Sequence, residues 1–139
     1  MDPKVVLKGM LEKAYRVEAG FESEANFKAF LEVMDEEQKK VLFQLMSDSE
    51  RHKTTLEDIA KNLGFQIEKK VEEFKFSDKR FFNEIYKLET SAKTLYEEMI
   101  LKFGNLLGKD VERLKELVKD EERHAKLVEK FVDKTLRIV

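Results

Sequence analysis

The chain has 139 residues, 40% of them charged, and its positive and negative side chains nearly cancel to a formal net charge of −2. This length fits a single domain, residues 1–139, and the interspersed charges argue against nucleic acid or an anionic membrane as a partner. Cysteine is absent, which excludes disulfides, thiolate chemistry and cysteine-ligated metal centres within the chain.

The hydrophobic residues do not form long uninterrupted runs. No stretch approaches the ~18 apolar residues that a membrane-spanning helix needs. The first ten residues, MDPKVVLKGM, lack the long apolar core of a signal peptide. We therefore expect a protein of the cytoplasm without a membrane segment.

The first predicted helix begins almost at the start of the chain. Asp2 is a suitable N-cap, and Pro3, the only proline, suits the first helical turn. We expect this helix to run to about Met34. A second helix should follow at once, because Asp35 can cap it and Gln38, three residues later, completes a capping-box pattern.

The second predicted helix ends near Leu63, since Gly64 is a typical helix stop. Residues 65–77 lose the heptad pattern of apolar positions and predict a long connection. Ser77 or Asp78 then offers a cap for the third helix.

The third predicted helix reaches Leu106 or Leu107, and Gly108 and Asp110 make a tight connection into the fourth, which should end near Arg137. Short loops within each pair of helices make the two pairs antiparallel, and the middle connection is long enough to run the length of a bundle. The expected fold is all-α, an antiparallel four-helix bundle of two helical hairpins joined by a long crossover.

Each apolar seam of the four helices is interrupted by polar residues near its middle. By heptad phase these residues point inward, as the leucines of the same seams do. A buried carboxylate is costly unless it is paired or bound to a cation, and the seams offer no Lys or Arg beside it. The pattern predicts a metal site, and its oxygen and imidazole donors suit iron or manganese, with zinc as a common substitute. The inward polar residues are Glu18, Ser49, His52, Glu89, Glu121 and His124.

The two hairpins also resemble each other in sequence. AYRVEA (14–19) matches IYKLET (85–90), and DSERH (48–52) matches DEERH (120–124). The spacing between the matched glutamate and the matched histidine is nearly the same in both halves. These matched points indicate an internal duplication.

The layout of Glu, a histidine motif, Glu and Glu-x-x-His on successive helices resembles the ferritin-like dimetal-carboxylate proteins. The short, duplicated form is similar to their rubrerythrin-like branch, most clearly in IYKLETSAKTLY followed by DEERH. The resemblance implies a ferritin-like fold and iron as the cofactor. It also implies a set of metal ligands, namely Glu18, His52, Glu89, Glu121 and His124.

Proteins of this kind react with oxygen or peroxide as peroxidases, ferroxidases or oxygen sensors, so the resemblance implies peroxide reduction or ferrous iron oxidation. No catalytic residue is assigned beyond the metal ligands. Rubrerythrins carry a cysteine-ligated iron domain that delivers electrons, and this chain has no cysteine. We therefore expect an external electron donor, and a homodimer of the kind found among rubrerythrin-like proteins.

The sequence departs from the family pattern at Ser49, where the resemblance implies a glutamate that bridges two metals. Asp48 and Glu22 are alternative carboxylates, although the heptad phase puts both toward the edges of their seams. Three interpretations stay open. The first is a dinuclear site, the second a mononuclear site on Glu89, Glu121 and His124, and the third a binding or structural bundle with a degenerate site.

Two aromatic features have competing interpretations. Tyr96 is expected to pack in the core with its hydroxyl near the site. The alternative interpretation for Tyr96 is a redox role. The phenylalanines of FKFSDKRFF (74–82) are expected to seal the crossover against the bundle. A dimer contact is the alternative interpretation for them.

Overall fold

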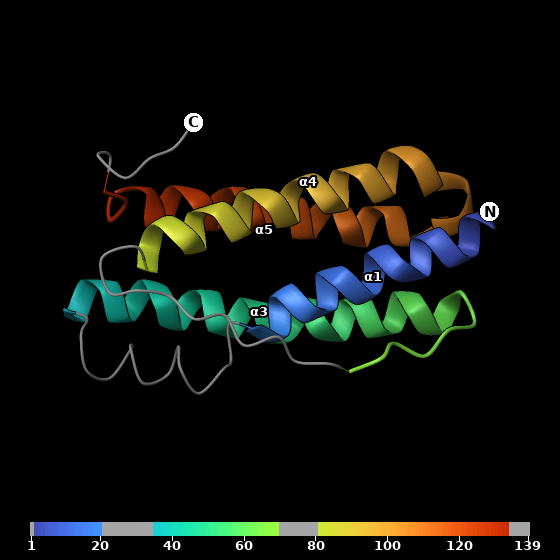
Figure 1. Ribbon diagram of the computed structural model, residues 1–139, viewed down its shortest axis with the longest axis horizontal. Coiled ribbons are helices and arrows are strands. Elements are labelled where there is room, and N and C mark those ends of the chain that lie inside the picture. Colours follow the sequence, from blue (N-terminus) through green and yellow to red (C-terminus); the bar gives the residue numbers. More distant parts are fainter. Residues whose placement is uncertain (1, 21–34, 70–80, 134–139) are drawn as a thin grey trace.

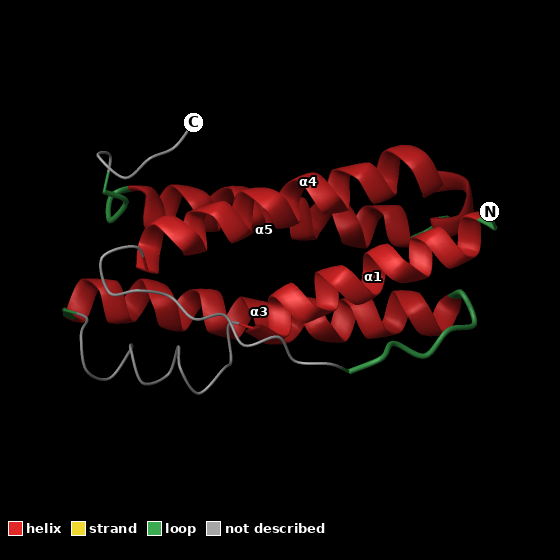
Figure 2. Ribbon diagram, in the orientation of Figure 1, coloured by secondary structure: helices red, strands yellow, loops and turns green. Residues whose placement is uncertain are grey.

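The computed structural model describes residues 2–20, 35–69 and 81–133. Within these ranges all regular structure is helical and there is no strand (Figure 2). The described helices lie along the long axis of the molecule (Figure 1). They are α1 (Pro3–Gly20), α3 (Glu36–Asn62), α4 (Phe81–Leu107) and α5 (Asp110–Glu129). The predicted helical bundle is confirmed.

The helices form two antiparallel pairs. α1 packs on α3 and α4 packs on α5, while α1 also contacts α4 and α3 also contacts α5. In Figure 1 the α1/α3 pair lies below the α4/α5 pair, and α3 and α4 run in the same direction. Each helix therefore has two neighbours, and side chains from all four can meet in the middle.

The predicted ends of the second helix are confirmed. Asp35 accepts a hydrogen bond from the backbone N–H of Gln38, and the Gln38 side chain accepts one from the N–H of Asp35, which completes the capping box. At the other end Gly64 has a φ of +86°. This left-handed conformation costs glycine little, so the chain can leave α3 there.

The last helix is shorter than predicted, because α5 ends at Glu129 and not near Arg137. The amide of Asn83, in the first turn of α4, donates to the carbonyl of Asp133 at 3.0 Å and accepts from its N–H at 2.9 Å. This reciprocal pair satisfies the backbone of Asp133 without a helical turn. Before this helix, Gly108 turns the chain with a φ of +56°. α4 reaches Leu107 as predicted, with one non-helical residue at Phe103.

Several sequence predictions fall outside the described residues. They are the continuation of the first helix to about Met34, the candidate carboxylate Glu22, and the cap at Ser77 or Asp78. The first two phenylalanines of FKFSDKRFF also lie outside, whereas Phe81 and Phe82 are buried in the core. Burial of this last pair shows that both side chains belong to the core, while the predicted seal against the crossover falls on residues outside the described ranges.

The apolar core consists of two clusters. The cluster toward the N-terminal end of α1 is built around Leu7, Leu11, Leu56, Ile59, Tyr96, Met99, Leu114 and Leu117. The cluster toward the N-terminal end of α3 contains Val41, Leu42, Leu45, Phe81, Phe82, Ile85 and Val128. Between them, at the same level of all four helices, lies a layer of buried polar side chains. The fold thus encloses this layer between two apolar clusters.

Candidate metal centre

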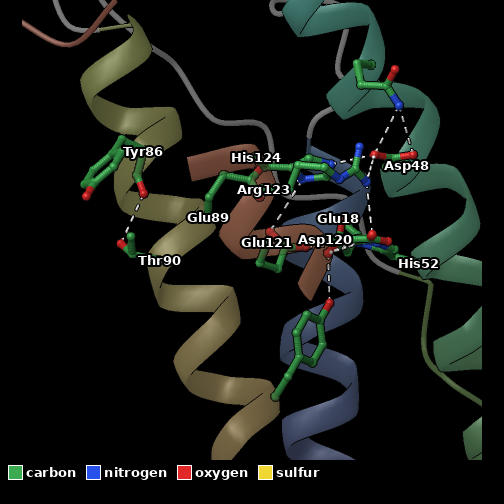
Figure 3. Close-up of polar contacts among 12 residues, drawn as sticks. Glu18, Asp48, His52, Tyr86, Glu89, Thr90, Asp120, Glu121, Arg123 and His124 are labelled. Carbon is green, nitrogen blue, oxygen red and sulfur yellow. Dashed lines mark hydrogen bonds and ion pairs between the residues drawn. The ribbon is translucent and has the colours of Figure 1, made fainter. Parts of the chain in front are cut away.

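The five residues predicted as metal ligands come together in this polar layer, with at most 2% of each residue exposed. One comes from α1, one from α3, one from α4 and two from α5 (Figure 3). Every helix contributes because each seam turns one polar side chain inward at the same level. The layer contains Glu18, His52, Glu89, Glu121 and His124.

The donor atoms form two overlapping groups. Glu18, His52 and Glu121 offer one ligand atom each within 4.8 Å of one another, and so do Glu89, Glu121 and His124. Nδ1 of His52 lies 3.1 Å from Oε1 of Glu18. Nδ1 of His124 lies 3.1 Å from Oε2 of Glu89. Glu121 belongs to both groups, so this buried arrangement can hold a metal ion at two adjacent positions.

Glu121 is the carboxylate that the protein leaves least satisfied. Its Oε1 is the one buried side-chain oxygen or nitrogen without a hydrogen bond in the described part of the chain. This oxygen lies 3.1 Å from Nδ1 of His52, and the same nitrogen lies 3.1 Å from Oε1 of Glu18, although it can donate only one proton. A buried oxygen without a donor is expensive, and a cation between these groups would remove that cost.

Without a cation, the layer limits its charge by holding protons on some of its glutamates. Burial raises the pKa of Glu89 to about 8. Burial, with the neighbouring charges of Glu18 and Glu89, also raises the pKa of Glu121 well above its ordinary value. Burial alone would lower the pKa of His52, yet its contacts with Glu121 and Glu18 raise it to about 11. Burial therefore disfavours the ionised forms of Glu89 and Glu121, and a divalent ion would supply positive charge that favours them.

Glu18 differs from the other two glutamates. Burial opposes its ionisation too, but hydrogen bonds led by that with His52 outweigh burial and lower its pKa. The Tyr96 hydroxyl donates to Oε1 of Glu18 at 2.8 Å, and the buried Ser49 hydroxyl contributes a further hydrogen bond. Tyr96 therefore lies in the core with its hydroxyl at the site, as predicted. Ser49 faces the layer from the position that corresponds to Glu121 in the other hairpin.

The sequence interpretation named Asp48 only as an alternative carboxylate ligand and did not name Asp120, and it did not anticipate that both aspartates lie behind the histidines. Nε2 of His52 lies 2.8 Å from Oδ2 of Asp120. Nε2 of His124 lies 2.6 Å from Oδ2 of Asp48. The Arg51 side chain holds the pKa of Asp48 below its ordinary value against the effect of burial, so the carboxylate only accepts, and Nε2 must carry the proton. This leaves Nδ1 of each histidine facing the glutamates.

Asp48 turns inward, but it contacts the outer nitrogen of His124 and not the centre of the layer. The signal that could have identified both aspartates was the repeat itself. DSERH and DEERH differ only at their second residue, so an aspartate and an arginine accompany each histidine. One turn of helix separates Asp from His on the same chain, yet each aspartate reaches the histidine of the opposite hairpin.

The comparisons with known proteins do not name a function. No family model matches the chain, and no solved structure matches it. A stretch of 22 residues is 86% identical to an uncharacterized protein of Archaeoglobus fulgidus, covering 16% of this chain and 88% of that protein. Among the described helices none is long and apolar enough to cross a membrane.

Proposed function

We propose that the polar layer binds two divalent metal ions, with iron as the native metal and manganese or zinc as substitutes. The observation that carries the proposal is the pair of buried donor groups that share Glu121, whose Oε1 has no hydrogen-bond partner. Two Glu/His groups without sulfur suit iron or manganese. Glu18, His52 and Glu121 would hold one ion, and Glu89, Glu121 and His124 would hold the other.

We further propose that the protein is a ferritin-like, rubrerythrin-like oxidoreductase that reduces peroxide or oxidises ferrous iron. A bound pair of ferrous ions would supply two electrons, which with two protons convert hydrogen peroxide to two water molecules. Since the chain has no cysteine-ligated centre, renewed turnover requires electrons from an external donor protein. The cytoplasm as location and a homodimer as assembly belong to the same proposal.

The chain's own residues support this chemistry in three ways. The two apolar clusters keep bulk water away from the layer, which strengthens electrostatic interactions inside it. Asp48 and Asp120 hold the Nε2 protons, so that Nδ1 of each histidine faces the glutamates. Because the pKa of His52 is raised to about 11, its Nδ1 proton would have to leave as an ion binds there. Glu89, with its pKa of about 8, carries its proton in the metal-free layer at neutral pH and would release it to a binding cation.

One observation favours a second candidate function. Ser49 is buried in the layer where the first hairpin would need a second bridging carboxylate, and a hydroxyl is a weaker ligand for iron. The alternative is therefore a binding or structural helical bundle with a degenerate metal site. It predicts a metal-free protein whose stability does not respond to added ferrous or manganous ions.

Metal content per chain tests the proposal. The protein is produced with added iron and manganese, purified without an affinity metal, and measured by elemental mass spectrometry beside His124→Ala. We expect two ions per chain in the natural protein and fewer in the variant, followed by activity with ferrous iron or peroxide. One ion per chain, unaffected by His52→Ala, would instead support a mononuclear site on Glu89, Glu121 and His124. Protein that stays empty after anaerobic ferrous loading would support the alternative.

A further inference from the structure

Two arginines and two aspartates form a closed group between α3 and α5, next to the histidines. Figure 3 shows three of the four residues, Asp48, Asp120 and Arg123. We call Asp48, Arg51, Asp120 and Arg123 the Arg/Asp bridge. Nη2 of Arg123 lies 3.0 Å from Oδ2 of Asp48 and 3.0 Å from Oδ1 of Asp120. Nη2 of Arg51 lies 2.5 Å from Oδ1 of Asp48 and 3.4 Å from Oδ2 of Asp120. Each arginine therefore contacts both aspartates.

The aspartates of the bridge connect it to both halves of the metal centre. Asp48, from the first hairpin, contacts His124 of the second, and Asp120, from the second hairpin, contacts His52 of the first. Because each arginine contacts both aspartates, and each aspartate contacts one histidine, each arginine is connected to both histidines through one intervening side chain. A movement of either arginine would reach the ring of His52 and the ring of His124 together.

The aspartates of the Arg/Asp bridge are much less exposed than its arginines. The side chain of Asp48 is 5% exposed and that of Asp120 20%, whereas the arginine side chains are 61% and 47% exposed. Only the 3.3 Å contacts from Gln44 to Asp48 add another side-chain hydrogen bond to either aspartate in the described residues. The arginines are therefore the main groups that hold the two carboxylates in place from the solvent side.

Arginine suits this task for a geometric reason. Its planar guanidinium can donate to two carboxylates at once from fixed directions, whereas the ammonium of lysine is a point charge on a flexible stem. A carboxylate that is fixed in this way orients the imidazole to which it is hydrogen-bonded. The outer partners of ligating histidines thereby change metal affinity without contacting the metal.

We propose that Arg51 and Arg123 are positioning residues that fix the orientation of both histidines together and so couple the two metal positions. The inference rests on the proposed metal function, which it deepens by assigning a joint control to residues outside the ligand set. Loss of one arginine should then disturb both histidines and not only the nearer one. An ordinary surface ion pair would have no such effect.

The same helix interface provides a matched control. Arg113 of α5 donates to Asp58 of α3 at 2.9 Å, with side chains that are 41% and 50% exposed. This pair also joins the two hairpins across the bundle surface, but neither of its residues contacts a histidine among the described contacts. Arg113 also lies 3.8 Å from Asp110 within α5, so Arg113→Ala reports the cost of losing surface ion pairs that do not contact a histidine.

Histidine NMR of the whole chain tests the inference, because its two histidines give two sets of ring signals. Exchange of the Nε2 protons with water is measured in metal-free protein, and zinc binding is measured by calorimetry. In Arg123→Ala we expect faster exchange at both rings and about tenfold weaker zinc binding at both steps. Arg113→Ala should match the natural protein, and Arg123→Lys should recover only part of the loss.

Several outcomes would overturn the inference. Arg123→Ala could behave like Arg113→Ala, a single histidine could respond, or lysine could restore both signals fully. Arg51→Ala provides a second variant should Arg123→Ala fold poorly, and the same joint response is expected from it. Natural protein that binds no zinc, iron or manganese would refute the proposed function, while the exchange data on metal-free protein would still decide whether the arginines position both rings.

Discussion

The two hairpins contribute matched sets of residues to the polar layer, and they differ at one decisive position. Each hairpin supplies a glutamate, an aspartate, an arginine and a histidine at corresponding places, and the aspartates reach across to the opposite histidines. The second hairpin adds Glu121, whereas the first has Ser49 at the same point. A frame with near twofold symmetry thus carries a single shared carboxylate.

The glutamates of the two halves also differ, because the pKa of Glu18 is lowered and the pKa of Glu89 is raised. Glu18 receives hydrogen bonds that include those from Tyr96 and Ser49, and its pKa is lowered in spite of burial. The pKa of Glu89 is raised to about 8, chiefly by burial. The first half therefore already holds an ionised ligand, and the second half holds a protonated one.

The largest effect should come from Glu121, because it serves both halves. Glu121→Gln keeps the size of the side chain but removes the carboxyl group that could ligate a cation, and we expect the ions of both positions to be lost. Metal-free Glu121→Gln should be about as stable as the natural protein, because burial already disfavours the ionised form of Glu121 and a neutral amide replaces it. Elemental analysis and urea unfolding measure these two results. Glu122→Gln is the matched control, because the adjacent Glu122 is half-exposed and pairs with Lys93 at the surface.

The next largest effect on metal content should come from the histidines, and each histidine should affect only the metal position of its own half. His52→Ala and His124→Ala each remove one Nδ1 donor, so each should lower the metal content by one ion per chain and leave the other position loaded. Titration with cobalt(II), followed by its visible absorption, distinguishes the remaining sites. A silent His52→Ala beside a metal-free His124→Ala would mean that the two halves are not equivalent positions and that the site is mononuclear.

Restoring the symmetry of the frame should have an intermediate effect. Ser49→Glu would place a second carboxylate opposite Glu121, and in metal-free protein we expect a loss of about 1–3 kcal/mol in the free energy of unfolding from crowding and repulsion. Zinc should reverse this loss and bind more tightly than to the natural protein. Ser49→Ala controls for removal of the hydroxyl. Destabilisation that zinc leaves unchanged would indicate that Ser49 does not face the metal positions.

Much of this arrangement was predictable from the sequence because it depends on periodicity. Glu18, His52, Glu89, Glu121 and His124 occupy apolar heptad positions, and all five are buried at one level. The capping box at Asp35 and the stops at Gly64 and Gly108 were also readable, since they rest on local backbone chemistry. The end of α5 was not, because it depends on Asn83, which is distant in sequence.

The second set of residues around the histidines could not be predicted from heptad phase. Asp48 and Asp120 lie at the edges of their seams, and only the crossing of the hairpins brings them to the opposite histidines. The heptad phase indicates which face of a single helix a residue lies on, whereas these contacts depend on the relative height and rotation of two helices. The duplication in DSERH and DEERH marked the residues, but it did not assign their partners.

The smallest effect should come from Tyr96, which acts on one half only. Tyr96→Phe removes the hydroxyl that donates to Glu18 at 2.8 Å, and a buried hydrogen bond to a charged group contributes about 1.5 kcal/mol or somewhat more. We expect a loss of about this size in the free energy of unfolding, and weaker zinc binding at the position of Glu18 and His52. The position of Glu89 and His124 should keep its affinity, because Tyr96 makes no hydrogen bond to it in the described residues. An equal loss at both positions would show that the two halves are more strongly coupled than their separate ligands imply.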